Sequence, residues 1–282
     1  MDKICVLGLG YIGLPTAALF AQAGFQVLGV DINAKIVSAV NEGRVHIKEE
    51  GLPELVRQLV REGRLRAALQ PEPADVFLIT VPTPLNEARQ ADLSYVIQAV
   101  EMISPLVKED NVIILESTVP PRTVDDLLVP MLRKTGLDPA TNLHVAHCPE
   151  RVLPGRILEE LLHNSRIVGG YTPEAARRAA DLYRRVVKGE VLETKALTAE
   201  MTKLMENTYR DVNIALANEL VKVAASLGVD ALEVIRLANQ HPRVNLHAPG
   251  PGVGGHCIAV DPYFIVEKAP QDSVLIQAAR HI

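Results

Sequence analysis

The first thirty residues combine short apolar runs and glycines in an order typical of strand, turn, helix and strand. Residues 3–8 form a mostly apolar run that predicts a buried strand, and glycine occupies three of the six positions 8–13. An alanine-rich segment over 14–23 predicts a helix that ends at a glycine, and residues 25–30 predict a second strand. This pattern indicates a βαβ unit at the start of the chain.

Further apolar runs follow, separated by segments with helical spacing. The predicted strands lie over residues 75–81, 111–117, 143–146 and 166–169. Strands that alternate with helices are typical of a parallel sheet covered on both faces. We therefore expect an α/β fold, in which a Rossmann-like doubly wound parallel sheet occupies residues 1–195.

The pattern changes after residue 195. Residues 196–227 contain neither glycine nor proline and predict one long helix, and a shorter helix is predicted over 230–239. Met201 and Met205 belong to a broad apolar face of the long helix, and we interpret both as core residues. The other members of this face are Thr208, Val212, Leu216, Val223 and Leu227. Residues 196–282 are expected to form an all-α central domain with a long connecting helix that contributes to a dimer.

Composition narrows the classes of function. The chain has 282 residues, which at roughly 150 residues per domain fits two domains. A net charge of −5, no tryptophan and 4% aromatic residues argue against a nucleic-acid-binding surface. No apolar run approaches the ~20 residues of a membrane span, and the N-terminus does not resemble a secretory signal. Three cysteines without a CxxC pair favour a reducing, cytoplasmic setting.

The glycines of the first turn carry the first chemical prediction. Gly8 would permit a tight turn, Gly10 would let a pyrophosphate approach the backbone, and Gly13 would let helix and strand pack closely. Asp31 ends the second strand, where an acid binds the adenosine ribose hydroxyls and repels a 2′-phosphate. The loop predicts NAD as the cofactor and residues 1–195 as its domain, although such a turn also occurs without a cofactor. The expected contacts here are Gly8, Gly10, Tyr11, Ile12, Gly13 and Asp31.

Three later loops each follow a predicted strand. Ligands of open α/β sheets bind outside the carboxyl ends of the strands, so these loops are expected to face the cleft. Pro82 and Thr83 follow one strand, and Ser117 and Thr118 follow another; all four are predicted cofactor contacts. Glu150 follows a third strand at the expected cleft edge. Proline-rich turns and solvated acids are also common for purely structural reasons. For each loop, a functional role and a purely structural role therefore both remain open.

The glycine-rich segment 249–262 is the most informative of all. It presents Cys257 in a polar loop, where a nucleophile is more expected than a buried inert thiol, and Asp261 follows four residues later. On the long helix, Lys203 and Asn207 are one turn apart and share a face. This face either contributes to the chemistry or is simply a hydrated surface. His256 is adjacent to Cys257, but adjacent side chains rarely form a useful dyad.

A metal site is not expected. His144, His147 and Cys148 lie close together in the sequence, but no further ligands follow at a suitable spacing. The combination of NAD, a cysteine nucleophile, a helix lysine and a cleft-edge glutamate instead suggests the oxidation of an alcohol through an aldehyde to an acid. That chemistry needs a stabilised oxyanion, a base and a placed water.

The chain resembles the UDP-glucose/GDP-mannose dehydrogenase family of four-electron oxidoreductases. The resemblance spans nearly the whole chain and rests on GLGYIGLP, Asp31, VPTP, ESTVPPRT, CPERVLPG, KLMENTYRDVNIALANEL and GPGVGGHCIAVDP in this order. It implies that Cys257 is the nucleophile, that Lys203 and Asn207 stabilise the oxyanion, and that Asp261 assists proton transfer. It further implies that Thr118 and Glu150 position water or the reacting oxygen. Arg243 would reach the substrate of a neighbouring subunit, which implies a homodimer.

The resemblance also bears on the substrate. Pro154 stands where UDP-glucose-oxidising members have a second glutamate, and CPERVLPG with HPRVN resembles the members that oxidise N-acetylated sugars. The implied substrate is a UDP-N-acetylhexosamine, UDP-N-acetyl-D-mannosamine first, with UDP-N-acetylglucosamine or UDP-glucose as alternatives. The product would enter surface polysaccharide synthesis. The implied substrate contacts are Glu150, Arg151, Val152, Lys203, Asn207, Arg243, His247 and Gly254.

Two rival interpretations remain open at this stage. The family carries a further domain that binds the UDP group, and the resemblance covers none of it, so a catalytically silent NAD-binding dimerisation module is one alternative. A dehydrogenase of the 6-phosphogluconate type shares the early architecture and a helix lysine. Cys257 argues against it, because that chemistry uses no cysteine nucleophile.

Overall fold

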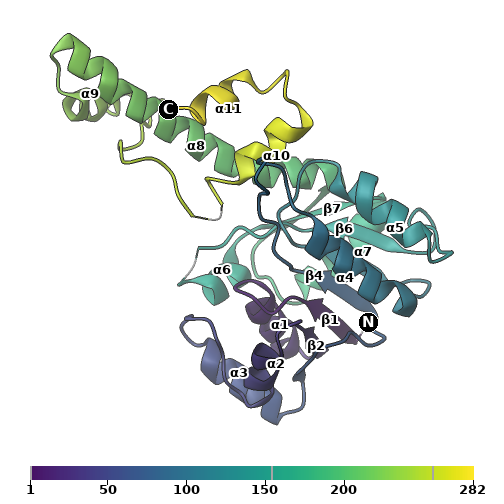
Figure 1. Cartoon of the computed structure of the whole chain (residues 1–282). Coiled ribbons are helices and arrows are strands. Elements are labelled where there is room, and N and C mark those ends of the chain that lie inside the picture. The colour runs from purple at the N-terminus through teal and green to yellow at the C-terminus, as the bar shows by residue number, and fades with distance from the viewer. Residues whose placement is uncertain (1, 154, 256) are drawn as a thin grey trace. The chain divides into compact units, whose positions relative to one another are not determined.

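The computed structural model describes residues 2–153, 155–255 and 257–282. The chain divides into two compact units, coloured by residue number in Figure 1. The first unit comprises Met1–Thr83 and Asp92–Glu200, and the second comprises Pro84–Ala91 and Met201–Ile282. The segment Pro84–Ala91 thus belongs with the helical part of the chain, which the sequence pattern did not indicate.

The first unit is built on an eight-stranded sheet with the order β3-β2-β1-β4-β5-β6-β7-β8. The strands are β1 Lys3–Leu7, β2 Gln26–Val30, β3 Leu65–Ala68, β4 Val76–Ile79, β5 Val112–Leu115, β6 His144–His147, β7 Arg166–Gly170 and β8 Val191–Lys195. The order reverses between β1 and β4, which is the switch point of a doubly wound sheet. The predicted fold class is therefore confirmed.

The sheet departs from the expected parallel arrangement at one pair of strands. β6 and β7 run antiparallel, with Ala146 opposite Gly170 and His147 opposite Gly169. Among the described residues of the connection 148–165, α6 is the only helix, and the chain reverses direction between the two strands instead of crossing over.

Helices cover both faces of the sheet. Successive residues of a strand point to opposite faces, so each strand contributes to two apolar cores. In β1, Ile4 and Val6 join one apolar core, whereas Cys5 and Leu7 join the other. The helices and helical turns of this unit are α1 Gly13–Gln22, α2 Ala34–Asn41, α3 Leu52–Arg61, α4 Ser94–Ile103, η1 Ser104–Leu106, η2 Val124–Leu128, α5 Val129–Arg133, α6 Ile157–His163 and α7 Pro173–Arg184. α1, α3 and α7 contribute to the first core, and α4 and α5 to the second.

Two strands were missed from the sequence, and both lie at the edges of the sheet. β3 has the sequence LRAA, without a β-branched residue, and β8 has the sequence VLETK with no buried residue. Edge strands bury fewer side chains and therefore carry a weaker apolar signal than central ones.

The second unit contains most of α8 Ala196–Leu227, with α9 Ala231–Ala238, α10 Asp261–Lys268 and α11 Val274–Ala279. Its small core is formed by Leu204, Phe264 and Ile265, and Met201 packs against it. Met205, in contrast, is 45% exposed, so its interpretation as a core residue is wrong. No helix of the described residues has an apolar stretch long enough to cross a membrane.

Pro84–Ala91 is fixed to α10 within the second unit. Leu85 and Ala91 form an isolated antiparallel bridge and pack against the small core. The Ala91 N–H donates to Glu267 Oε2 at 2.9 Å, and Arg89 Nη1 donates to the Tyr263 hydroxyl at 2.9 Å. These contacts explain why the segment folds with the helices.

The glycine turn after β1 depends on close backbone contacts. Gly8 has φ +94°, a left-handed conformation that favours glycine. A Cβ atom on Gly13 would lie 1.8 Å from Gly8 O and 2.4 Å from Thr80 Oγ1, so the start of α1 packs directly on the turn. A Cβ atom on Gly10 would meet nothing within 4 Å.

We expect Gly13→Ala to lower the free energy of unfolding of the first unit by about 1–3 kcal/mol, because the added methyl group must displace backbone atoms. Gly10→Ala is the matched control: it adds the same methyl group in open space and is expected to change that free energy by less than about 0.5 kcal/mol. Urea unfolding followed by circular dichroism measures both variants. Equal losses in the two would contradict the packing argument.

Candidate functional site

The glycine turn and Asp31 are joined by direct hydrogen bonds. Asp31 Oδ2 accepts from the Leu9 N–H at 3.0 Å, and Asp31 Oδ1 accepts from the Asn33 N–H at 2.9 Å. Tyr11 is 57% exposed. No side chain caps the N-terminus of α1 and no acid occupies its first turn, so its N–H groups can bind an anion. These features fit a dinucleotide with its pyrophosphate at Gly10, Tyr11 and Ile12.

The loops after β4 and β5 are held against each other. Ser117 Oγ donates to Val81 O at 2.6 Å, and Thr83 Oγ1 donates to Thr118 O at 2.5 Å. Thr80 Oγ1 lies 2.8 Å from Gly8 O, which places the loop after β4 beside the glycine turn. The structure therefore brings Pro82, Thr83, Ser117 and Thr118 to the carboxyl edge of the sheet. Ser117 is buried, and its hydroxyl is used in the hydrogen bond to the backbone of the neighbouring loop.

Glu150 is not the solvated acid that the sequence left open. Its side chain is only 10% exposed and forms an ion pair with the buried guanidinium of Arg166, on β7. The Arg151 N–H donates to Glu150 Oε1 at 2.6 Å, and the Arg151 guanidinium donates to Ser165 O. Val152 packs beside α6. Pro154 lies outside the described residues.

A second buried carboxyl lies behind this ion pair, and sequence reasoning did not single it out. The Tyr183 hydroxyl donates to Glu116 Oε1, and the Arg166 guanidinium lies 5.1 Å from the centre of the Tyr183 ring. Burial raises the pKa of Glu116 to about 7, and Glu150 adds to this effect while Arg166 opposes it. The one feature of the sequence that could have indicated Glu116 is its position directly after an apolar strand.

The cysteine loop and α8 form the centre of the second unit. Asn207 Nδ2, on α8, donates to Asp261 Oδ2, on α10, at 2.6 Å. The Asp261 and Val260 N–H groups both donate to Cys257 O, at 2.9 and 3.0 Å, so the cysteine lies in the turn that begins α10. Asp261 and Asn207 are buried, whereas Cys257 is exposed. The structure thus brings the predicted Cys257, Asp261 and Asn207 together.

The charges at this centre act on the thiol in opposite directions. Burial raises the pKa of Asp261 to about 6, although the Asn207 hydrogen bond and the Lys203 charge both favour its ionised form. Although the residue is exposed, partial desolvation of the Cys257 thiol and the charge of Asp261 raise its pKa, while Lys203 and Arg210 lower it. The net effect is upward, so the thiol is protonated at neutral pH and needs a partner that removes its proton.

The segment that precedes Cys257 is anchored to two helices. Asn239 exchanges two hydrogen bonds with the backbone of Leu246, and Gly250 N–H donates to Asn218 Oδ1 at 2.8 Å. The His247 ring meets the Tyr209 ring edge-on, with 6.4 Å between centroids. The predicted substrate residues Arg243 and Gly254 are exposed. His256, the neighbour in the rejected dyad, lies outside the described residues.

The two histidines of β6 lie in different surroundings. His144 Nε2 lies 3.4 Å from Asp110 Oδ1. His147 is buried, which lowers its pKa to about 3 and keeps it neutral. Within the described ranges no group of three potential ligands comes together.

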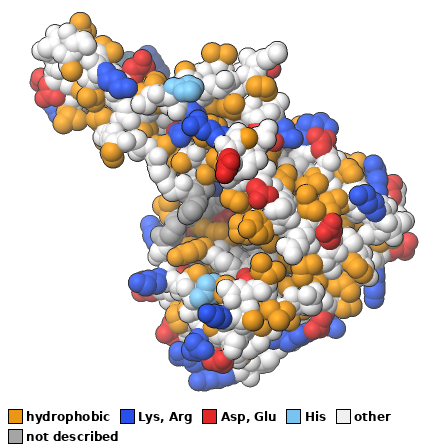
Figure 2. Space-filling view, in the orientation of Figure 1, with side chains coloured by type: hydrophobic (Ala, Val, Ile, Leu, Met, Phe, Trp, Pro, Cys, Tyr) orange, Lys and Arg blue, Asp and Glu red, His pale blue; other side chains and the backbone are white. Residues whose placement is uncertain are grey.

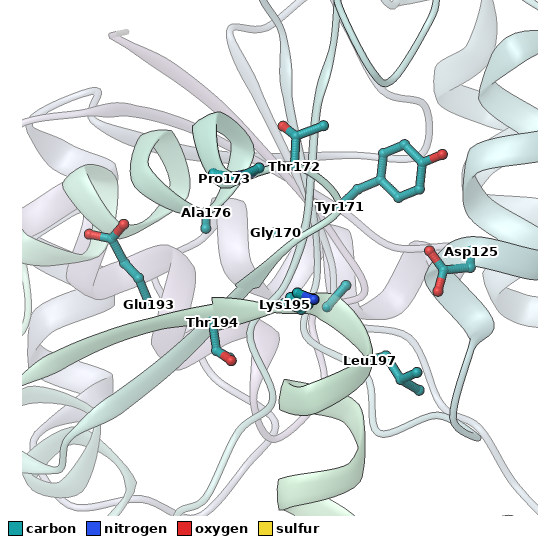
Figure 3. A pocket seen from close by; sticks show the side chains of 11 residues that line it. Asp125, Gly170, Tyr171, Thr172, Pro173, Ala176, Glu193, Thr194, Lys195 and Leu197 are labelled. Atoms are coloured by element: carbon teal, nitrogen blue, oxygen red, sulfur yellow. The ribbon is translucent and has the colours of Figure 1, made fainter.

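Figure 3 shows a pocket that lies elsewhere in the first unit, with a cavity volume of about 470 Å³. It is formed by the ends of β7 and β8 and the starts of α7 and α8, and none of the predicted site residues lines it. The lining residues are Asp125, Gly170, Tyr171, Thr172, Pro173, Ala176, Glu193, Thr194, Lys195, Ala196 and Leu197.

Similarity to known proteins extends over nearly the whole chain. Residues 2–187 match the NAD-binding domain of the UDP-glucose/GDP-mannose dehydrogenase family, and residues 197–282 match its central domain. The chain is 51% identical to the UDP-N-acetyl-D-mannosamine dehydrogenase of Methanocaldococcus jannaschii, over 99% of this chain and 65% of that protein. It is 49% identical to the NDP-N-acetyl-D-galactosaminuronic acid dehydrogenase of Ralstonia solanacearum, over 99% of this chain and 68% of that protein.

A solved structure agrees with this comparison. The UDP-N-acetyl-mannosamine dehydrogenase Cap5O from S. aureus superposes with a TM-score of 0.93 at 51% identity. The match covers 99% of this chain and 68% of that one. The chain therefore spans about two thirds of the length of the relatives it matches.

The electrostatics of the cysteine centre generate two opposite predictions. Asp261→Asn removes a negative charge that opposes thiolate formation, so the pKa of Cys257 should fall and alkylation by iodoacetamide at pH 7 should accelerate. Lys203→Met removes a positive charge that favours the thiolate, so the same rate should decrease. Rate–pH profiles with a Cys257→Ser blank measure both. Shifts in the same direction would contradict the assignment of charges.

Proposed function

Because the chain belongs to the UDP-glucose/GDP-mannose dehydrogenase family, we propose that it carries the NAD-binding and catalytic parts of a UDP-N-acetyl-D-mannosamine dehydrogenase. The reaction is the four-electron oxidation of the C6 alcohol of the sugar to a carboxylate, which gives UDP-N-acetyl-D-mannosaminuronate. The observation that carries the proposal is the exposed thiol of Cys257 at the start of α10, beside the buried pair of Asp261 and Asn207.

NAD is the proposed cofactor of the first unit. The open space at Gly10, the uncapped N-terminus of α1 and the carboxylate of Asp31 support this, because they suit a pyrophosphate and an unphosphorylated ribose. When bound, NAD accepts one hydride in each of two successive oxidations.

Cys257 forms the covalent bond to the substrate. Its sulfur adds to the carbon of the intermediate aldehyde, the carbonyl π bond opens and the aldehyde oxygen gains the proton that the thiol loses, giving a thiohemiacetal whose oxidation yields a thioester. Lys203 and Asn207 stabilise the oxygen anion during addition. Asp261 assists proton transfer, and its pKa of about 6 lets it hold or release a proton near neutrality.

Hydrolysis completes the reaction. Water attacks the thioester carbon, the carbon–sulfur bond breaks, and Cys257 leaves as a thiolate that regains its proton. We assign the positioning of this water and of the reacting oxygen to Thr118 and Glu150. The ion pair with Arg166 keeps the Glu150 carboxylate in a fixed orientation, which supports this role.

The proposed substrate contacts are those that the family resemblance implies. They are Glu150, Arg151, Val152, Lys203, Asn207, Arg243, His247 and Gly254. The identities of 51% and 49% to relatives named for two different N-acetylated sugar reactions support a UDP-N-acetylhexosamine as the class of substrate. We place UDP-N-acetyl-D-mannosamine first because two of the reported relatives carry that name.

We propose a homodimer formed through α8. Five exposed apolar residues recur at spacings of four and seven along this helix and share one face: Met205, Tyr209, Leu216, Val223 and Leu227. Figure 2 shows hydrophobic side chains on the surface of the segment that contains α8 and α9. An exposed apolar stripe with this spacing is typical of helix–helix association, and a second copy of the chain offers the same stripe. A cytoplasmic location is supported by three unpaired cysteines.

We expect Leu216→Glu to shift the chain from dimer to monomer, because it places a charge in the middle of the stripe. Lys222→Glu is the control, since it introduces the same side chain on the same helix away from the stripe. Size-exclusion chromatography with light scattering measures the molar mass of both. A dimer that persists in Leu216→Glu, or a monomeric parent chain, would contradict the proposed interface.

The proposed reaction is tested by the amount of NADH formed from UDP-N-acetyl-D-mannosamine. We expect two NADH per sugar consumed, and Cys257→Ser should form no acid while slow aldehyde formation persists. UDP-N-acetylglucosamine and UDP-glucose serve as competing substrates. Acid formation at an undiminished rate by Cys257→Ser would exclude the covalent mechanism, and NAD binding without NADH would favour the silent module.

A further inference from the structure

A buried ion pair in the second unit has no role in the proposed reaction. Arg280, just after α11, places Nη1 2.5 Å from Asp211 Oδ1, on α8. The side chains are 14% and 2% exposed, respectively. The pair therefore joins α11 to α8 in the interior, where charged groups require a specific partner.

Arg280 also contacts α10. Its guanidinium carbon lies 5.2 Å from the centre of the Tyr263 ring, and the Arg89 guanidinium lies at the same distance from that ring. Tyr263 is two residues beyond Asp261 in the first turn of α10. One side chain thus touches α8 through a carboxylate and α10 through an aromatic ring.

These contacts lie next to the cysteine centre. Asp211 follows Asn207 by four residues, so the two share a face of α8 one turn apart. Asn207 donates to Asp261, and Asp211 binds the arginine that contacts Tyr263. Two successive turns of α8 are therefore attached to the first turn of α10.

Stability alone is a poor explanation for this ion pair. Asp211 Oδ2 and Arg280 Nε are buried and have no hydrogen-bond partner among the described residues. A buried pair whose polar atoms are only partly satisfied is often matched in stability by well-packed apolar side chains. What a charged pair supplies is a fixed direction, because the contact is made only when carboxylate and guanidinium meet in one orientation.

We propose that Arg280 is a positioning residue for Cys257: through Asp211 and Tyr263 it fixes α10 on α8 and so keeps Asp261 in contact with Asn207. The proposal rests on the proposed function only for the identity of the cysteine centre. The charged groups that act on Cys257 are Asp261, Lys203 and Arg210. In this proposal Arg280 acts on the thiol only through Asp261.

The test is the pH profile of Cys257 alkylation by iodoacetamide, which requires neither NAD nor a sugar. Arg280→Met should release α10, expose Asp261 to water and lower the pKa of Cys257, so that alkylation at pH 7 accelerates several-fold. Arg236→Met is the matched control, because Arg236 pairs with Glu233 on the exposed surface of α9. A profile for Arg280→Met equal to that of the control would overturn the proposal.

A double-mutant cycle separates positioning from general stability. If Arg280 acts through Asp261, the effect of Arg280→Met should be clearly smaller in the Asp261→Asn background. An effect of equal size in both backgrounds would overturn the proposal. Turnover with UDP-N-acetyl-D-mannosamine is measured separately, so an inactive parent chain would count against the proposed function and not against this cycle.

A further variant covers the case in which Arg280→Met fails to fold. The combination of Asp211→Leu with Arg280→Met removes both charges and keeps apolar bulk between the helices. We expect this protein to fold, as judged by a cooperative thermal transition, and still to show the faster alkylation. A parental alkylation profile in the folded double variant would mean that packing alone positions the centre, which would contradict the role of the ion pair.

Discussion

The hydrogen bond from the Asn207 amide to the buried Asp261 carboxylate is the contact on which the cysteine centre depends. It joins α8 to α10 at the turn that presents Cys257, and it holds a carboxylate where burial opposes its charge. Asp261 in turn raises the pKa of the Cys257 thiol, whereas the charge of Lys203 lowers it. The reactivity of Cys257 is therefore set by how firmly two helices hold one carboxylate.

The first unit also contains a carboxyl group whose pKa is raised by burial. Glu116 is buried behind the Glu150–Arg166 ion pair, and its pKa is raised to about 7 by burial. A single guanidinium thus lies near two carboxyls, so a change in the charge of one alters the proton affinity of the other. In the first unit, the supporting guanidinium of Arg166 lies outside the sequence motifs, whereas in the second unit the motifs contain both Asn207 and Asp261.

The sequence predicted local features well and long-range contacts poorly. The glycine turn, the strands that follow it and the full extent of α8 depend on neighbouring residues, so their patterns could be recognised directly. The attachment of Pro84–Ala91 to α10 joins Ala91 to Glu267, which lie 176 positions apart, and no local pattern indicates such a contact. Met205 illustrates a second limit, because helical spacing places it on an apolar face without indicating whether that face is covered.

The most direct test of this account is the titration of the Asp261 carboxyl by NMR of selectively ¹³C-labelled protein, in the parent chain and in Asn207→Ala. The account predicts a midpoint near pH 6 in the parent chain. It also predicts a higher midpoint in Asn207→Ala, because loss of the amide donor disfavours the ionised form. A midpoint close to the ordinary value of 3.8, unchanged by Asn207→Ala, would contradict the claim that this buried contact governs the centre.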